Sequence, residues 1–260
     1  MNERPRPKPS AAIPFPLSPV AHRGLHRPSR GIVENTPSSV EAAIARGYAI
    51  EVDLQSALAD HPVVYHDETL DRLNNAIGLV STRSVAELKA IPYKATTDRI
   101  FTFDELLEQV AGRVPLFIEV KTMFTTPMFT TPGTYERRIA ESVRRYRGPL
   151  ALMSFDPVSL AALRRQRLRV PIGLISYRWD DDWMPQLPLS RRLALKRMAA
   201  AAELSPDFIA YDINGLPDPV PTAYCRTNGV PLLTWTVKTQ SLRRKAEAIA
   251  DAIIFEGFDA

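Results

Sequence analysis

Acidic, basic and imidazole side chains recur in this sequence where apolar runs end or pass into loops. If those runs are parallel strands, their carboxyl ends meet at one edge of a sheet or one mouth of a barrel, and the side chains converge there. Each of these groups is costly to place beside apolar strand residues without a partner. The residues concerned are His22, Arg23, Glu51, Asp53, His66, Glu119 and Lys121.

The two histidines of this set suit acid–base chemistry, because imidazole changes protonation state near neutral pH. His22 and His66 both stand at the end of a predicted strand, and we expect the two strands to be neighbours. His26 and His61 fall in a predicted loop and turn and are weaker candidates. Either histidine considered alone is more often an ordinary rim residue.

The carboxylates of the set are spaced for a shared site. Glu51 and Asp53 are two residues apart and therefore point to the same side of a strand, and Glu119 and Lys121 have the same spacing. Three carboxylates in one place need positive charge among them. A hard divalent cation, Mg²⁺ or Ca²⁺ in preference to zinc, would supply it. A salt-bridge cluster in which Arg23 and Lys121 balance the acids accounts for the spacing equally well.

The elements that must position these residues alternate along the chain. Capping patterns predict several helix starts: Thr36 with Pro37, Ser84 with Glu87, and Thr102 with Glu105. The predicted helices cover residues 37–46, 84–91, 102–111, 134–146, 157–165 and 190–204. The predicted strands cover residues 19–22, 48–54, 62–66, 115–120, 150–154, 170–175, 207–211, 231–237 and 252–255.

Strands separated by helices favour parallel pairing with the helices outside. Repeated over this length, the pattern predicts an α/β fold of the (β/α)₈ TIM-barrel type, and an open doubly wound sheet is the alternative. The strand-like runs exceed the eight staves of a barrel by one, and periodicity does not identify the extra run. Trp235 and Lys238 fall at the end of the eighth run, so Trp235 is a candidate to pack against a substrate.

Composition limits the class of protein. The chain has 260 residues, 45% of them hydrophobic, and a net charge of +4 from 33 basic and 29 acidic residues. This weak excess does not indicate a nucleic-acid partner. No apolar stretch approaches the ~20 residues of a membrane helix. One cysteine permits no internal disulfide, and we expect a cytoplasmic protein. Residues 1–19 are expected to form a flexible proline-rich arm before one domain at 20–260.

Two loops invite sharper hypotheses. A tandem repeat, Met-Phe-Thr-Thr-Pro at 123–127 and again at 128–132, directly follows a strand that carries proposed site residues. It is either a lid over the mouth or a passive duplication. The loop at 176–189 contains Trp179, Trp183 and Asp180 to Asp182. These side chains could receive a cationic head group, or the tryptophans could pack locally.

The order of short motifs resembles the glycerophosphodiester phosphodiesterase family. The motifs are Ala21-His22-Arg23-Gly24, Glu34-Asn35-Thr36, Glu51-Val52-Asp53, Val63-Val64-Tyr65-His66-Asp67, Leu70-Asp71-Arg72, Ile118-Glu119-Val120-Lys121 and Thr234-Trp235-Thr236-Val237. Together they extend over residues 20 to about 255. Each motif is short, but their order and spacing are specific.

The resemblance implies a barrel related to phosphoinositide-specific phospholipase C. It implies that His22 and His66 are the catalytic pair and that Glu51, Asp53 and Glu119 bind one divalent cation. It further implies that Arg23 and Lys121 contact the phosphate, with Glu34 in the polar site near them. The implied reaction splits a small glycerophosphodiester into an alcohol and glycerol 3-phosphate.

The chain departs from the family pattern at three places. Residues 57–60 lack the usual Thr-x-Asp-Gly turn, Leu73-Asn74-Asn75 follows Arg72 in place of two threonines, and Phe255-Glu256-Gly257 stands where Thr-Asp-x-Pro is frequent. None of these departures removes a catalytic residue type. Three other functions remain as alternatives: a phospholipase-D-like or lyase-type enzyme acting on lysophospholipids, a non-catalytic phosphodiester-binding module, and a nucleotide-dependent enzyme. The last lacks a glycine-rich phosphate loop.

Overall fold

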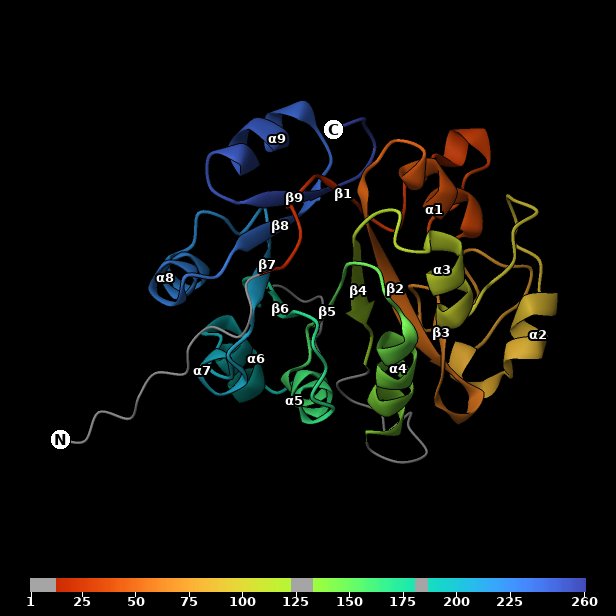
Figure 1. The fold of residues 1–260 in the computed structure, drawn as a ribbon, viewed down its shortest axis with the longest axis horizontal. Coiled ribbons are helices and arrows are strands. Elements are labelled where there is room, and N and C mark those ends of the chain that lie inside the picture. Colours follow the sequence, from red (N-terminus) through yellow and green to blue (C-terminus); the bar gives the residue numbers. More distant parts are fainter. Residues whose placement is uncertain (1–12, 123–132, 181–186) are drawn as a thin grey trace.

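The computed structural model describes residues 13–122, 133–180 and 187–260, and its parallel strands close into a barrel with helices around the outside (Figure 1). The barrel strands are β1 (Val20–Ala21), β2 (Ala49–Ala57), β4 (Leu116–Val120), β5 (Leu150–Ser154), β6 (Ile172–Ser176), β7 (Phe208–Asp212), β8 (Leu232–Val237) and β9 (Ala252–Phe255). Because β1 pairs with both β2 and β9, the sheet has no open edge in the barrel. The TIM-barrel prediction is confirmed, and the open-sheet alternative is wrong.

The extra strand-like run is β3 (His61–Val64), which lies outside the barrel. It pairs antiparallel with β2 over Leu54 to Ala57, beyond the point where β4 ends opposite Leu54. The expectation that His22 and His66 come from neighbouring barrel strands is therefore wrong. A short apolar run can form either a parallel barrel strand or an antiparallel strand outside the barrel, and the sequence pattern does not distinguish the two.

The strands bury side chains on both faces, as parallel barrel strands must. Phe117, Met153 and Phe208 belong to a cluster inside the barrel. Their neighbours Ile118 and Leu152 belong to a larger cluster that includes the inner faces of the helices. Ile13, Phe15 and Leu17 pack against the inner cluster, with the Phe15 ring 5.7 Å from that of Phe117. Apolar side chains thus fill the barrel below the functional residues.

The helices largely follow their capping signals. They are α1 (Pro37–Ile44), α2 (Val85–Ala90), α3 (Phe103–Val110), α4 (Thr134–Arg145), α5 (Pro157–Arg165), α6 (Leu189–Lys196), α7 (Ala201–Leu204), α8 (Pro219–Asn228) and α9 (Gln240–Glu247). Ser84 and Thr102 form the predicted capping boxes. The single helix expected at 190–204 is wrong: Met198 takes a left-handed conformation and separates α6 from α7. No glycine or proline marks this break.

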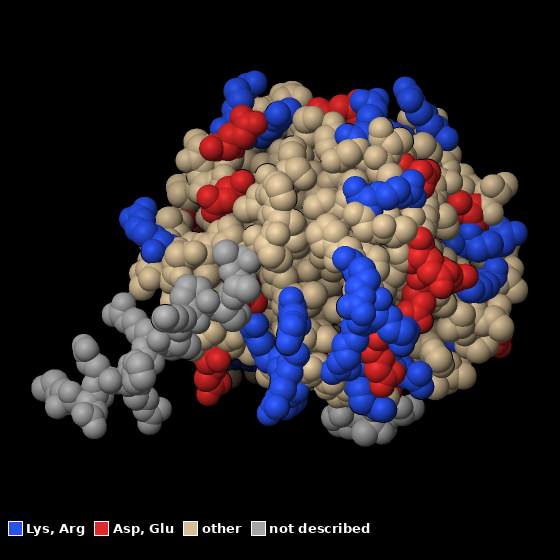
Figure 2. All heavy atoms as spheres, viewed as in Figure 1, with Lys and Arg blue, Asp and Glu red and all other residues tan. Residues whose placement is uncertain are grey.

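Charged side chains of both signs are interspersed on the face shown in Figure 2, with basic ones gathered toward its lower edge. In the basic run that ends α5, Arg164 pairs with Asp207 at 2.9 Å and donates to Ser205 O. Arg164 thus has a partner within the protein, and its place in the basic run needs no external anionic ligand to explain it. Within the described ranges, no helix is both long and apolar enough to cross a membrane.

Candidate active site

The carboxyl end of the barrel holds a pocket that gathers nearly all of the predicted site residues. The pocket has a volume of about 130 Å³. Its polar wall consists of His22, Arg23, Glu51, His66, Glu119 and Lys121, and its apolar wall includes Met153, Phe155, Ile175, Ala210 and Trp235. Such a cavity, with an apolar side and convergent polar groups, is the usual form of a small-molecule site.

The three carboxylates of the predicted cation site lie together, and two of them, Glu51 and Glu119, line this pocket. Glu51 and Asp53 point inward from β2, and Glu119 is the partner of Asp53 in the register of β2 with β4. Glu51 and Asp53 are each 1% exposed and Glu119 is 8% exposed. One oxygen of each carboxylate lies within 4.8 Å of an oxygen of the others.

Electrostatics in this group indicates a shortage of positive charge. Burial, followed by repulsion from Asp53 and Glu119, raises the pKa of Glu51 well above its usual value. Burial also raises the pKa of Glu119. At Asp53 burial acts in the same direction, but Lys121, His66 and Arg23 outweigh it and hold the pKa below its usual range. The acids therefore cannot all ionise freely without another cation nearby.

One oxygen of this group fits a bound cation directly. Glu51 Oε1 is buried and has no hydrogen-bond partner in the part of the chain that the structure describes. Its other oxygen accepts a hydrogen bond from the Arg23 backbone N–H at 2.9 Å. A buried, unpartnered carboxylate oxygen among other carboxylates suits a hard divalent ion, which prefers oxygen ligands.

Arg23 and Lys121 lie beside the carboxylates and pair with them. Lys121 Nζ is 3.0 Å from Asp53 Oδ1 and also contacts Glu119. Arg23 Nε is 3.4 Å from Asp53 Oδ2, and its NH1 donates to Glu34 at 2.6 Å. The salt-bridge arrangement considered from the sequence is thus present. It leaves Glu51 without an ion-pair partner on its free oxygen, so a cation and the salt bridges can coexist.

His22 is held by a carboxylate that the sequence analysis did not assign to the site. Its Nδ1 lies 2.6 Å from Glu256 Oε2, and its Nε2 faces the cation site, 3.9 Å from Glu51 Oε2. Burial lowers the pKa of His22 despite the opposing hydrogen bond to Glu256. A neutral ring that donates from Nδ1 keeps an acceptor lone pair on Nε2, directed into the pocket.

His66 reaches the same pocket from the loop after β3. The Tyr65 backbone N–H donates to Asp53 O at 3.0 Å, and Gln55 Nε2 donates to His66 O at 2.9 Å. Its Nδ1 lies 2.6 Å from Asp67 Oδ1. Both histidines therefore have a carboxylate on Nδ1, and each has Nε2 left for another partner.

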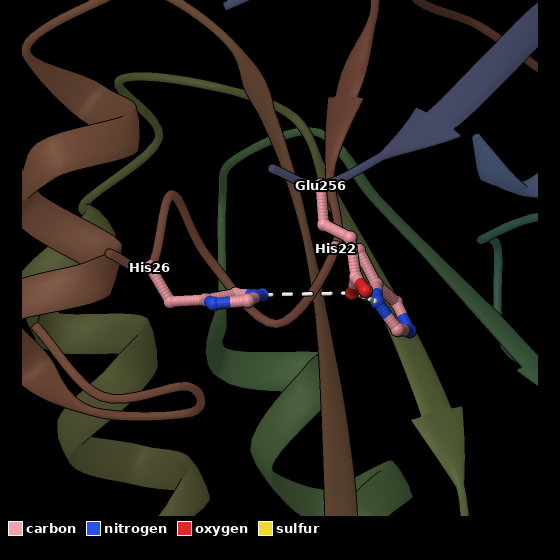
Figure 3. Close-up of side chains that lie close together, drawn as sticks. All are labelled: His22, His26 and Glu256. Carbon is pink, nitrogen blue, oxygen red and sulfur yellow. Dashed lines mark hydrogen bonds and ion pairs between the residues drawn. The ribbon is translucent and has the colours of Figure 1, made fainter. Parts of the chain in front are cut away.

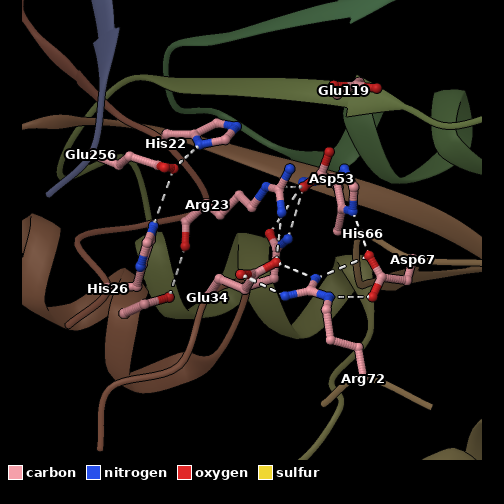
Figure 4. A network of polar contacts seen from close by, with 12 residues as sticks. His22, Arg23, His26, Glu34, Asp53, His66, Asp67, Arg72, Glu119 and Glu256 are labelled. Carbon is pink, nitrogen blue, oxygen red and sulfur yellow. Dashed lines mark hydrogen bonds and ion pairs between the residues drawn. The ribbon is translucent and has the colours of Figure 1, made fainter. Parts of the chain in front are cut away.

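A chain of ion pairs connects the surroundings of the two histidines (Figure 4). Arg72 donates to both oxygens of Asp67, at 2.6 and 3.0 Å, and to Glu34 at 2.7 and 3.1 Å. Glu34 in turn accepts from Arg23. Glu34 thus joins Arg23 to Arg72, a positioning arrangement that leaves the remaining donors of Arg23 for an anionic ligand.

Sequence reasoning missed four residues that hold the site: Glu256, Asp67, Arg72 and Asn35. Glu256 directly follows the last strand, and this position at a strand end is the signal in the sequence that identifies it. Asp67 adjoins His66. For Arg72 and Asn35 the family motifs were the only signal.

The aromatic residues of the predictions have different environments. Trp235 lies in the pocket wall, with its ring 5.4 Å from that of Phe155. Trp179 is 3% exposed, stacks on Tyr177 and donates from Nε1 to Ser176 Oγ at 3.0 Å. Its local packing leaves no exposed face for a head group. Trp183 and the repeat at 123–132 lie outside the described residues.

The turn that carries Arg23 needs a glycine after it. Gly24 has φ +76°, and a Cβ there would lie 2.5 Å from Ser39 Oγ and 2.7 Å from Ser39 C. Gly47 has a similar φ of +68° but open space around it. We expect Gly47→Ala to lower the free energy of unfolding by roughly 1–2 kcal/mol. Gly24→Ala should cost about 1–3 kcal/mol more because of the clash. Urea unfolding of both variants measures the difference, and equal losses would contradict this account of the turn.

Comparison with known proteins places the chain among phosphodiesterases. A model of the glycerophosphoryl diester phosphodiesterase family matches residues 22–260. A glycerophosphodiester phosphodiesterase of Caldanaerobacter subterraneus is 29% identical over 90% of this chain and 92% of its own length. One from Bacillus subtilis is 27% identical over 76% of this chain and 67% of its own.

Solved structures share the fold. A phosphodiesterase from Oleispira antarctica, solved in complex with the product sn-glycerol-3-phosphate, has a TM-score of 0.74 at 21% identity, covering 92% of this chain and 93% of its own. A glycerophosphodiester phosphodiesterase from Thermotoga maritima has a TM-score of 0.66 at 22% identity, covering 94% of each chain.

Proposed function

Because the chain belongs to the glycerophosphoryl diester phosphodiesterase family, whose fold is enzymatic, we propose that it hydrolyses small glycerophosphodiesters to an alcohol and glycerol 3-phosphate in a metal-dependent reaction. One observation carries this proposal: acidic, basic and imidazole side chains line one small pocket, and each imidazole has a carboxylate on its Nδ1. These side chains are His22, His66, Glu51, Glu119, Arg23 and Lys121. The product bound to the Oleispira antarctica phosphodiesterase supports the same choice of product here.

Glu51, Asp53 and Glu119 would hold the cation, Mg²⁺ or Ca²⁺, because all three offer hard oxygen ligands. When bound, such an ion would act as a Lewis acid and stabilise negative charge on a phosphoryl oxygen. Arg23 and Lys121 donate hydrogen bonds to the other phosphoryl oxygens, where negative charge accumulates in the transition state. Trp235 packs against the carbon skeleton of the substrate on the apolar side of the pocket.

His22 and His66 transfer the protons. His22 acts as the base through Nε2, since its lowered pKa keeps the ring neutral, and Nδ1–H donates a hydrogen bond to Glu256. His66 acts as the acid and protonates the departing alkoxide, with Asp67 on its Nδ1 stabilising the charged ring. The nucleophile is water, or a free hydroxyl of the substrate's glycerol, which would give a cyclic intermediate.

The test is release of glycerol 3-phosphate from a panel of glycerophosphodiesters with choline, ethanolamine and glycerol head groups. The purified chain is assayed as isolated, after EDTA and dialysis, and after reloading with Mg²⁺ or Ca²⁺. We expect metal removal to lower the rate by about 10²-fold or more, because Lewis-acid stabilisation is worth several kcal/mol, and we expect reloading to restore it.

Two outcomes would contradict parts of the proposal. A full rate in the dialysed protein, with metal absent by elemental analysis, would remove the metal dependence. No product from any diester by folded, metal-loaded protein would remove the activity. Lysophosphatidylcholine is included to test the alternative, since lysophosphatidate release at a higher kcat/KM than any water-soluble diester would favour a lysophospholipid substrate.

A further inference from the structure

A second cluster of possible metal ligands lies beside the active pocket, on the side away from the three carboxylates. It consists of His22, His26 and Glu256 (Figure 3). The first two follow β1 and the third follows β9, and these strands are paired neighbours in the barrel. Glu256 Oε2 lies 2.6 Å from His22 Nδ1 and 3.6 Å from His26 Nε2. The three side chains are 14–18% exposed and lie beside the pocket.

The donor atoms of this cluster differ in kind from those of the cation site. Two imidazole nitrogens and one carboxylate oxygen are typical zinc ligands, whereas an all-carboxylate site favours Mg²⁺ or Ca²⁺. Zinc bonds of roughly 2.0–2.2 Å in a tetrahedral arrangement hold ligand atoms about 3.3 Å apart. The contact of His22 with Glu256 would lengthen and that of His26 would shorten slightly, both by small side-chain rotations.

His26 supplies an independent reason to expect a ligand. Both of its ring nitrogens are shielded from solvent, and neither makes a hydrogen bond with any described residue. A buried polar group left in this state lowers the stability of the folded protein. The proposed reaction gives His26 no task, because among the described residues the charged partner of its Nε2 is the Glu256 oxygen that already holds His22. A metal ion at this point would satisfy Nε2.

We propose that Zn²⁺ binds His22 Nδ1, His26 Nε2 and Glu256 Oε2 and that its binding inhibits the enzyme. A zinc bond uses the Nδ1 lone pair, so the neutral ring must carry its proton on Nε2. That nitrogen then cannot accept a proton from a nucleophile. The ring also cannot gain a second proton to become imidazolium, so it is a poor acid. Inhibition therefore follows whichever of the two roles His22 has.

Lys238 opposes the binding of zinc. Its Nζ lies 2.7 Å from Glu256 Oε1, which leaves Oε2 for a metal but places a positive charge close by. The ammonium group is 61% exposed. Removing this charge by Lys238→Gln should increase zinc affinity. A zinc site far from Glu256 would not respond to this change.

The experiment titrates Zn²⁺ into the Mg²⁺-saturated enzyme, so that Mg²⁺ occupies the carboxylate site. Two quantities are measured: the zinc concentration for half-maximal inhibition of glycerol 3-phosphate release, and zinc bound per chain by equilibrium dialysis. His26→Ala should keep its uninhibited rate and need about 10–100-fold more zinc, as expected for loss of a metal-site contact. Lys238→Gln should need less zinc. His61→Ala removes an exposed histidine outside the cluster and should match the wild type.

Equal zinc sensitivity of His26→Ala and wild type would overturn the site. So would inhibition that is relieved by raising Mg²⁺, because it would show displacement at the carboxylates. The inhibitory effect rests on the proposed role of His22, but zinc binding does not. Zinc that binds the wild type, is lost in His26→Ala and leaves the rate unchanged would support the site and contradict the role of His22.

Discussion

Replacing either His22 or His66 with alanine is expected to lower kcat by about 10²–10⁴-fold, the usual contribution of a positioned acid or base. Each histidine has a carboxylate on Nδ1 and directs Nε2 elsewhere, which is the arrangement of an oriented proton carrier. Both side chains line the pocket, so truncation enlarges that pocket and opens no new void in the apolar core. Steady-state release of glycerol 3-phosphate under saturating metal measures the effect.

His61→Ala is the matched control, since His61 is exposed at the start of β3. Its kcat should equal that of the wild type. Circular dichroism at the assay temperature verifies that all three variants are folded. The double variant should lose much less than the product of the two single losses, because groups that act in one step are not additive. A kcat near the wild-type value in either single variant would remove that residue from the mechanism.

Glu51→Gln is expected to have opposite effects on activity and on stability. With one ligand of the cation lost, kcat should fall by about 10³-fold, equivalent to ~4 kcal/mol of transition-state stabilisation. In metal-free protein the same change removes a buried carboxylate that faces Asp53 and Glu119 and has an unpartnered oxygen. We expect the free energy of unfolding to rise by about 1–3 kcal/mol, because the neutral amide avoids the desolvation and repulsion that raise the pKa of Glu51, and each unit of such a shift corresponds to ~1.4 kcal/mol.

Thermal unfolding with and without Mg²⁺ distinguishes this result from general damage. Metal binding should raise the Tm of the wild type, because the ion binds only the folded state, and should raise that of Glu51→Gln far less. Glu108→Gln, a change at an exposed position of α3, should match the wild type in both conditions. A metal-free variant that is less stable than the wild type would contradict the electrostatic account of the site.

Local patterns in the sequence predicted most of the barrel and the residue types of its site. The spacing of Glu51 and Asp53 placed both on one face of a strand, because alternation is a property of the strand alone. Ser84 and Thr102 indicated helix starts, because a capping box involves only four residues. These two predictions were confirmed, because each depends only on residues close together in the sequence.

Features that depend on distant partners were not predicted. The direction of β3 depends on its pairing with the overhang of β2. Glu256 meets His22 across 234 positions of sequence. The break at Met198 was also not predicted, although it is a local feature: it has no glycine or proline and falls within a run of good helix formers, so helix propensity extends the helix through it.

The return of the chain through β3 divides the site between two separately packed parts. The excursion between β2 and α3 has its own apolar cluster, with Tyr65, Leu70, Leu88 and Tyr93 among its members. It carries His66, whereas His22 and the carboxylates belong to the barrel. Local opening of the excursion would therefore remove His66 from the pocket, and with it the proposed proton transfer, while the barrel and its candidate metal ligands stay intact. For the same reason, substitutions in the excursion can change the surroundings of His66 without disturbing the three carboxylates in the barrel.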